Sequence, residues 1–96
     1  MRTAARTDGN QTPIVEALRA IGAKVVITSQ LKNAFDILVG FRGQLFIMEL
    51  KDGKLPPSRK KLTPGELKCK GDFEAVGVVY HVIESKEQAV NLLLKQ

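Results

Sequence analysis

Two apolar runs decide the fold: Phe35-Asp-Ile-Leu-Val-Gly-Phe41 and Gln44-Leu-Phe-Ile-Met-Glu-Leu-Lys51. Near-continuous runs of this kind are typical of strands that are covered on both faces of a sheet. Each run is interrupted by one carboxylate, Asp36 in the first and Glu49 in the second. A charge inside such a strand costs free energy unless it is paired or binds a metal ion, so both acids need an explanation.

The dipeptide Arg42-Gly43 separates the two runs and predicts a tight hairpin turn, because glycine readily adopts left-handed backbone angles. If this dipeptide is the centre of the turn, Asp36 and Glu49 lie directly opposite each other on neighbouring strands. Side chains alternate between the two faces of a strand, so Lys51 shares the face of Glu49. The sequence therefore predicts that three charged side chains meet on one patch of the sheet.

The chemistry of this patch follows from its charges. Two facing carboxylates repel each other unless a cation lies between them, and an oxygen-rich site with access to water suits Mg²⁺. A lysine beside the ion could position or activate a water molecule and stabilise the charge on a phosphate, as metal-dependent phosphodiester hydrolysis requires. The alternative is a salt bridge in which Lys51 pairs with Asp36 or Glu49, because structural ion pairs also occur at such positions.

The segments around these strands predict helices on both faces of one sheet. A first helix starts at Thr12-Pro13, a capping hydroxyl followed by proline, and ends at Gly22. A strand covers residues 24–28. A capping box at Thr63-Pro-Gly-Glu66 opens a weak second helix that runs to about Phe73.

A fourth strand covers residues 76–83, and Ser85, with Gln88 three residues later, caps a last helix. We expect no functional role for Tyr80 and His81 in this strand. The predicted class is α/β, with the order α-β-β-β-α-β-α and a mixed sheet flanked by helices. We expect one domain over residues 1–96, with residues 1–9 flexible.

The composition favours a polyanionic partner, because the net charge is +5 and the pI is about 9.6. A single cysteine, Cys69, excludes an internal disulfide framework and fits a reducing compartment, so we expect a cytoplasmic location. No apolar stretch approaches the length of a membrane span. We therefore expect no membrane association, and no organic cofactor.

Basic residues follow the predicted site closely. Such a cluster could hold phosphates while the two acids hold a metal ion. The alternative is a solvated loop that only aids solubility. The candidate DNA-binding residues are Lys54, Arg59, Lys60, Lys61 and Lys68.

The chain resembles the PD-(D/E)xK nuclease superfamily, whose core is αβββαβ with Asp on the second strand and (Asp/Glu)-x-Lys on the third. More narrowly, it is similar to the small stand-alone VRR-NUC (virus-type replication-repair nuclease) domains of phage and bacterial genomes. The matching stretches cover nearly the whole chain. They are Asp8-Gly-Asn-Gln11, Ala17-Leu-Arg-Ala-Ile-Gly22, Phe35-Asp-Ile-Leu-Val-Gly40, Ile47-Met-Glu-Leu-Lys-Asp-Gly53 and Leu62-Thr-Pro-Gly-Glu66.

The resemblance implies a restriction-endonuclease-like αβββαβ(α) core in a bacterial or phage-infected cell. It implies that Asp36 and Glu49 bind Mg²⁺ or Mn²⁺ with the Leu50 carbonyl as a further ligand. It also implies that Lys51 orients or deprotonates the attacking water. Phe35 stands where the family usually has proline before the Asp.

Two further positions are implied by the resemblance. The first helix of the superfamily often supplies an acid to the site; the aligned residue is Gln11, which leaves the number of metal ions open. The second helix usually carries a Gln near its start, and the match is Glu66 or Leu67, depending on the register. Stand-alone members tend to form homodimers, so we expect a homodimer.

We therefore expect a metal-dependent DNA endonuclease that nicks DNA or selects branched and junction structures. The alternative is a non-catalytic nucleic-acid-binding subunit that keeps the nuclease fold as a scaffold. A third option is a small protein-interaction module whose basic charge is incidental. Metal dependence separates the first function from the others, and salt-sensitive DNA binding separates the second from the third.

Overall fold

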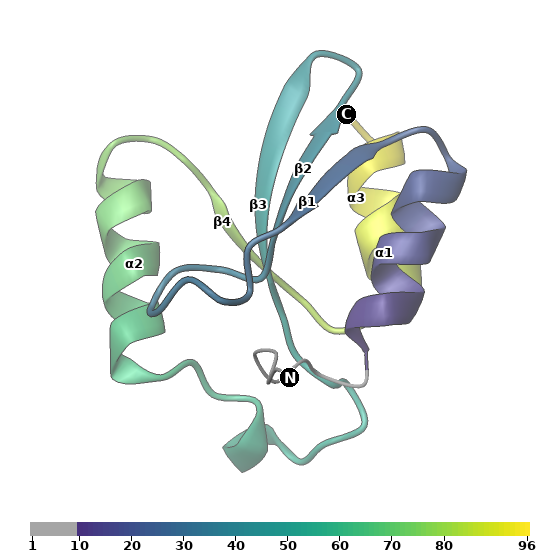
Figure 1. Cartoon of the computed structure of the whole chain (residues 1–96). Coiled ribbons are helices and arrows are strands. Elements are labelled where there is room, and N and C mark those ends of the chain that lie inside the picture. The colour runs from purple at the N-terminus through teal and green to yellow at the C-terminus, as the bar shows by residue number, and fades with distance from the viewer. Residues whose placement is uncertain (1–9) are drawn as a thin grey trace.

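One four-stranded sheet separates helices that lie on its two sides (Figure 1). The computed structural model describes residues 10–96, and the predicted flexibility of residues 1–9 lies outside this range. Helices α1 (Gln11–Ala20) and α3 (Lys86–Leu94) lie side by side on one side of the sheet, and α2 (Pro64–Ala75) lies on the other. The predicted α/β class and flanking helices are confirmed.

The sheet is mixed, as predicted. Its strands lie in the order β1 (Lys24–Ile27), β2 (Ile37–Phe41), β3 (Gln44–Leu50) and β4 (Tyr80–Ile83). The pairs β1–β2 and β2–β3 are antiparallel, and β3–β4 is parallel. A single turn of 3-10 helix, η1 (Pro57–Arg59), interrupts the connection from β3 to α2.

The predicted turn between β2 and β3 is confirmed. Both of its residues have left-handed backbone angles, with φ of 50° at Arg42 and 82° at Gly43. Phe41 pairs with Gln44 directly beside the turn, and the same register continues to the pair of Ile37 with Met48. This register places Met48 and Leu50 on one face of β3 and Glu49 on the other.

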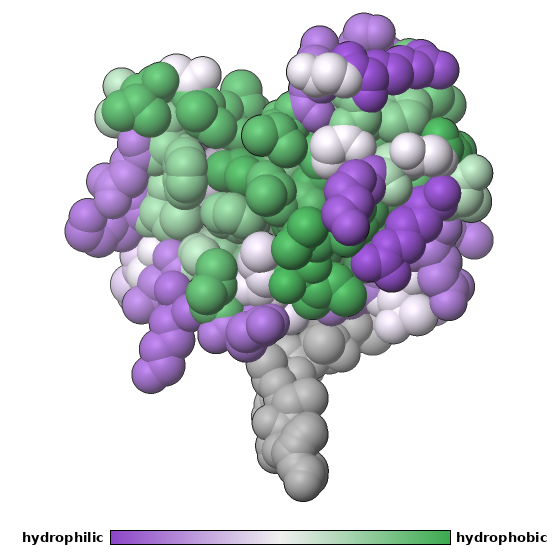
Figure 2. Space-filling view, turned by 45° about the horizontal axis from the view of Figure 1, so that its top comes forward, coloured by the Kyte–Doolittle hydropathy of each residue, from purple (hydrophilic) through white to green (hydrophobic). Residues whose placement is uncertain are grey.

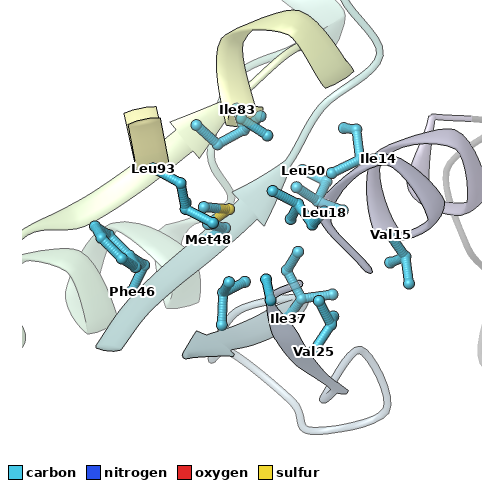
Figure 3. Packing of buried hydrophobic residues seen from close by; sticks show 13 residues of the cluster. Ile14, Val15, Leu18, Val25, Ile37, Phe46, Met48, Leu50, Ile83 and Leu93 are labelled. Carbon is cyan, nitrogen blue, oxygen red and sulfur yellow. The ribbon is translucent and has the colours of Figure 1, made fainter. Parts of the chain in front are cut away.

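The core fills the space between the sheet and the α1–α3 layer (Figure 3). It is built from one face of each strand and the apolar stripes of the two helices, so a single cluster joins all of these elements. Eight large side chains are fully buried: Ile14, Leu18, Ile37, Val39, Met48, Leu50, Ile83 and Leu93.

The first helix ends as predicted but begins earlier. The N–H groups of Gly22 and Ala23 donate to the carbonyls of Arg19 and Leu18, and Gly22 has the positive φ that this closing turn requires. The prediction that Thr12 caps the helix is wrong. Asn10 is the N-cap, and its side chain donates to the carbonyls of Lys51 and Glu84, which directly follow β3 and β4.

The predicted start of the fourth strand at Val76 is also wrong, because α2 runs two residues further than expected. The helix closes with Gly77, at φ of 89°, donating to the Glu74 carbonyl and Val78 donating to the Phe73 carbonyl. These backbone groups complete the helix end instead of pairing with β3, and β4 begins at Tyr80. Among residues 10–96, no helix is long and apolar enough to cross a membrane.

Candidate active site

The predicted acids and lysine lie together where β2 begins and β3 ends. Glu49 is the second-to-last residue of β3, and only 4% of its surface is exposed. Its Oε2 lies 3.5 Å from Nζ of Lys51. Asp36 directly precedes β2, and its Oδ2 accepts a hydrogen bond of 2.8 Å from the Leu50 N–H. All three residues therefore lie at the same end of the two inner strands of the sheet.

The position of Asp36 differs in one respect from simple strand pairing. The β2–β3 ladder ends at Ile37 and Met48, and the Asp36 N–H donates to the Met48 carbonyl at 3.0 Å. Asp36 therefore lies beyond the last ladder pair, and its carboxylate takes the place of a backbone acceptor for Leu50. This bond fixes the carboxylate against the strand that carries Glu49.

Helix α2 brings a further carboxylate to the site. The predicted capping box is present: Thr63 Oγ1 accepts from the Glu66 N–H, and Glu66 Oε1 accepts from the Thr63 N–H at 3.0 Å. The same Oε1 accepts from Lys51 Nζ at 3.2 Å. Glu66, rather than the exposed Leu67, is thus the second-helix residue that reaches the site.

A glycine allows α2 to approach the loop that carries Asp36. A Cβ atom at Gly65 would overlap the side chain of Asn33, so only glycine fits at this helix position without a shift. Further along the helix, the ring of Phe73 makes an edge-to-face contact with Phe35 at a centroid distance of 6.1 Å. These contacts hold the first turn of α2 beside the acids.

The electrostatics of the site are dominated by an excess of carboxylates. Burial raises the pKa of Glu49 to about 9, and the nearby carboxylates of Asp36 and Glu66 add to the effect. Burial alone would lower the pKa of Lys51, but its contacts with Glu66 and Glu49 raise it above its ordinary value. The lysine therefore stays charged between carboxylates that it only partly neutralises.

The donor set fits a small hard cation. Asp36 and Glu49 supply carboxylate oxygens, and a divalent ion beside Glu49 would favour its ionised form against the burial and the repulsion that raise its pKa. Among residues 10–96, no group of three or more His, Cys, Asp or Glu side chains is placed to hold an ion. An ion held by two acids would keep several of its water ligands, as Mg²⁺ does by preference.

The first helix contributes backbone-directed contacts rather than an acid. Gln11 is buried, as its predicted helical face requires. Its neighbour Asn10, which the sequence reading missed, donates from Nδ2 to the carbonyls of Lys51 (3.0 Å) and Glu84 (2.6 Å). A polar residue before a helix was the available signal, although its partners lie far along the chain.

The predicted DNA-binding residues fall into two groups. Lys54, Arg59 and Lys61 are exposed on the connection that follows the site. Lys60 is partly buried, with Nζ 3.0 Å from Oε1 of Glu84, and Lys68 pairs with Asp72 on α2 at 2.9 Å. The first group offers its charge to solvent, whereas the second shares its charge with an acid.

The comparisons with known proteins bear directly on the fold. No protein-family model and no curated protein matches the chain. A solved structure described as a VRR_NUC domain matches with a TM-score of 0.65 and 26% sequence identity, over 88% of this chain and 89% of that chain. The likeness confirms the resemblance of the sequence to the VRR-NUC domains and indicates a nuclease-type domain.

Proposed function

We propose that the protein is a metal-dependent DNA endonuclease that nicks DNA or cuts branched structures. The proposal rests on one observation: Asp36, Glu49 and Lys51 lie together at one end of the inner strands of a nuclease-type fold. We assign Asp36 and Glu49 to metal binding, with the Leu50 carbonyl as a further ligand. The ion would be Mg²⁺ or Mn²⁺, and it would supply Lewis-acid chemistry at the scissile phosphate.

The chain's own residues divide the work around the scissile phosphate. Lys51, held in its charged form, orients the attacking water and stabilises charge on the phosphate. Glu66 holds Lys51 through its bond of 3.2 Å and keeps the ammonium close to the acids. Asn10 fixes the Lys51 backbone at its carbonyl.

A polyanionic strand would be held by the exposed basic residues next to the site. Lys54, Arg59 and Lys61 lie on the connection between β3 and α2, and a phosphate backbone is held by contacts of this kind without reading its sequence. Lys60 and Lys68 would contribute less, because each already faces an acid. Selection by DNA structure rather than sequence follows from this arrangement.

A homodimer is part of the proposal. Apolar side chains gather on the face of the molecule that Figure 2 shows, and monomeric proteins rarely expose large contiguous patches of this kind. Leu45 is 74% exposed and lines a shallow hollow together with Val78 and Val79. We propose that a second copy covers this surface and that the dimer presents two sites to one DNA molecule.

One observation favours the alternative of a non-catalytic binding subunit. Lys51 is engaged by Glu66 and Glu49 at the same time, as it would be in a purely structural ion pair. Such a subunit would bind DNA through the same basic connection without cutting it. The cytoplasmic location stays a prediction under both functions.

The carboxylate excess leads to a prediction on stability. With chelator present, Glu49→Gln should raise the free energy of unfolding by about 1–3 kcal/mol at about pH 7. The raised pKa means that the folded protein holds this proton more tightly than the unfolded chain, so wild-type stability falls as pH rises from about 4.5 toward 9. The gain should therefore nearly vanish at about pH 4.

Urea titrations at both pH values measure this difference. Glu16→Gln is the matched control, since Glu16 is exposed on α1 and should respond little at either pH. An equal gain from Glu49→Gln at both pH values would show that the carboxylate charge is not its cause.

The catalytic assignment predicts different losses for the acids and the lysine. Asp36→Ala and Glu49→Ala should each abolish cutting of supercoiled plasmid and branched DNA in Mg²⁺ or Mn²⁺ and greatly weaken Mn²⁺ binding in calorimetry. Lys51→Ala should lose cutting by about a hundredfold or more and still bind Mn²⁺. Cutting at the wild-type rate by any of the three variants would contradict its assignment.

The proposed phosphate contacts predict a loss of DNA affinity that is the same for all sequences. Replacing Arg59, Lys60 and Lys61 together by alanine should weaken binding to all sequences about equally and reduce the salt slope by about one unit per lost phosphate contact. The matched control replaces Lys24 and Lys95, which are exposed on β1 and directly after α3. If the control variant loses as much affinity, the contact surface lies elsewhere.

The assembly predicts a mass of about two chains in light scattering at micromolar concentration. Val79→Glu should shift the protein toward monomers, because a charge on the apolar patch opposes burial. Ala20→Glu is the control, since Ala20 is exposed at the end of α1 and does not line this hollow. A wild-type mass near 10.5 kDa would rule out a stable dimer.

A further inference from the structure

The hydroxyl of Tyr80 lies between Glu49 and the segment that carries Asp36. Tyr80 is the first residue of β4 and is only 3% exposed. Its Oη donates a hydrogen bond of 2.7 Å to the Ala34 carbonyl and lies 3.4 Å from Oε1 of Glu49. Ala34 is two residues before Asp36, so one side chain contacts both Glu49 and the segment that carries Asp36.

The sheet register explains how the hydroxyl reaches this place. Tyr80 pairs with Ile47 across the parallel β3–β4 ladder, and facing residues share one side of a sheet. Glu49 lies two residues further along β3 and therefore projects from the same side. The length of the tyrosine ring then carries its hydroxyl along this face to the carboxyl group.

Other contacts hold the Asp36 segment, and they differ from this one. Thr28 Oγ1 donates to the Phe35 carbonyl at 2.7 Å, and the Thr28 N–H donates to the Asp36 carbonyl at 2.8 Å. The ring of Phe35 packs against Phe73. These contacts tie the segment to β1 and α2, whereas the contact of Tyr80 also reaches Glu49.

We propose that Tyr80 is a positioning residue that sets the spacing of Asp36 and Glu49 for binding of a divalent cation. The inference rests on the proposed function, which assigns these two acids to the metal. A hydroxyl that binds the Ala34 carbonyl on one side and contacts the Glu49 carboxyl group on the other restricts the movement of Glu49 relative to the Asp36 segment. Groups that orient metal ligands in this way typically change metal affinity about 10–100-fold when they are removed.

The first test removes one oxygen atom. Tyr80→Phe keeps the buried ring and should remain folded in thermal unfolding, but its Mn²⁺ affinity in calorimetry should be about tenfold weaker than that of the wild type. Thr28→Val is the matched control, because it removes a hydrogen bond of the same length to the neighbouring carbonyl without any contact with Glu49. This control should bind Mn²⁺ nearly as well as the wild type.

The second test uses a spectroscopic property of the wild-type chain. Tyr80 is its single tyrosine and tryptophan is absent, so tyrosine emission reports on this one ring. A cation bound at Glu49 changes the charge within a few ångströms of Oη, so emission should change saturably with Mg²⁺. The midpoint should match the Mg²⁺ affinity from calorimetry, and Glu49→Gln should remove the response.

The outcomes separate this inference from the proposed function. If wild-type protein binds Mn²⁺ and Tyr80→Phe binds it equally well, the positioning role is wrong and the proposed function stands. Equal losses in Tyr80→Phe and Thr28→Val would also overturn it, since anchoring of the loop alone would then explain both. Unchanged emission at saturating Mg²⁺ counts against it as well, whereas a wild-type protein that binds neither ion overturns both proposals.

Discussion

The register of β2 against β3 is the constraint on which the site depends. A shift of one residue would turn every side chain of β3 to the opposite face, placing Glu49 in the apolar layer under α1 and α3 and exposing Met48 and Leu50. The two-residue turn with left-handed angles at Arg42 and Gly43 fixes this register at one end. Burial of Met48 and Leu50 fixes it along the strand, so the core and the turn together decide where the carboxyl group points.

The second helix depends on a few separate contacts rather than on a buried face. None of the residues of α2, all within the described range, is buried. The helix is held instead by the packing of Gly65 on Asn33, the edge contact of Phe73, and the bond from Lys51 to Glu66. Because Glu66 closes the capping box and also holds Lys51, the start of the helix and the position of the lysine are coupled. A change that loosens the Thr63 cap should therefore also loosen Lys51.

The parts of the site that follow from local sequence could be predicted, and those that follow from distant packing could not. The turn, the capping box at Thr63, and the shared face of Glu49 and Lys51 each depend on residues close in sequence, and each is confirmed. The sequence does not decide whether Glu66 or Leu67 faces the site, because α2 has no clear apolar face that would fix its rotation about its axis. The contacts of Tyr80 could not be predicted from the sequence. Its hydroxyl reaches Ala34 and Glu49 only because β3 and β4 pair in parallel, and a long connection separates these two strands in the chain.

Glu49 carries a buried carboxyl group whose proton the folded protein holds tightly. A small domain has only about 5–15 kcal/mol of net stability, so a carboxyl group whose ionisation opposes folding removes a substantial share of it. A purely structural ion pair needs one acid for Lys51, and Glu66 already provides it at 3.2 Å. Glu49 lies 3.5 Å from the same Nζ, and burial together with the carboxylates of Asp36 and Glu66 raises its pKa. A divalent cation beside Asp36 and Glu49, as we propose, would favour the ionised form of both carboxyl groups.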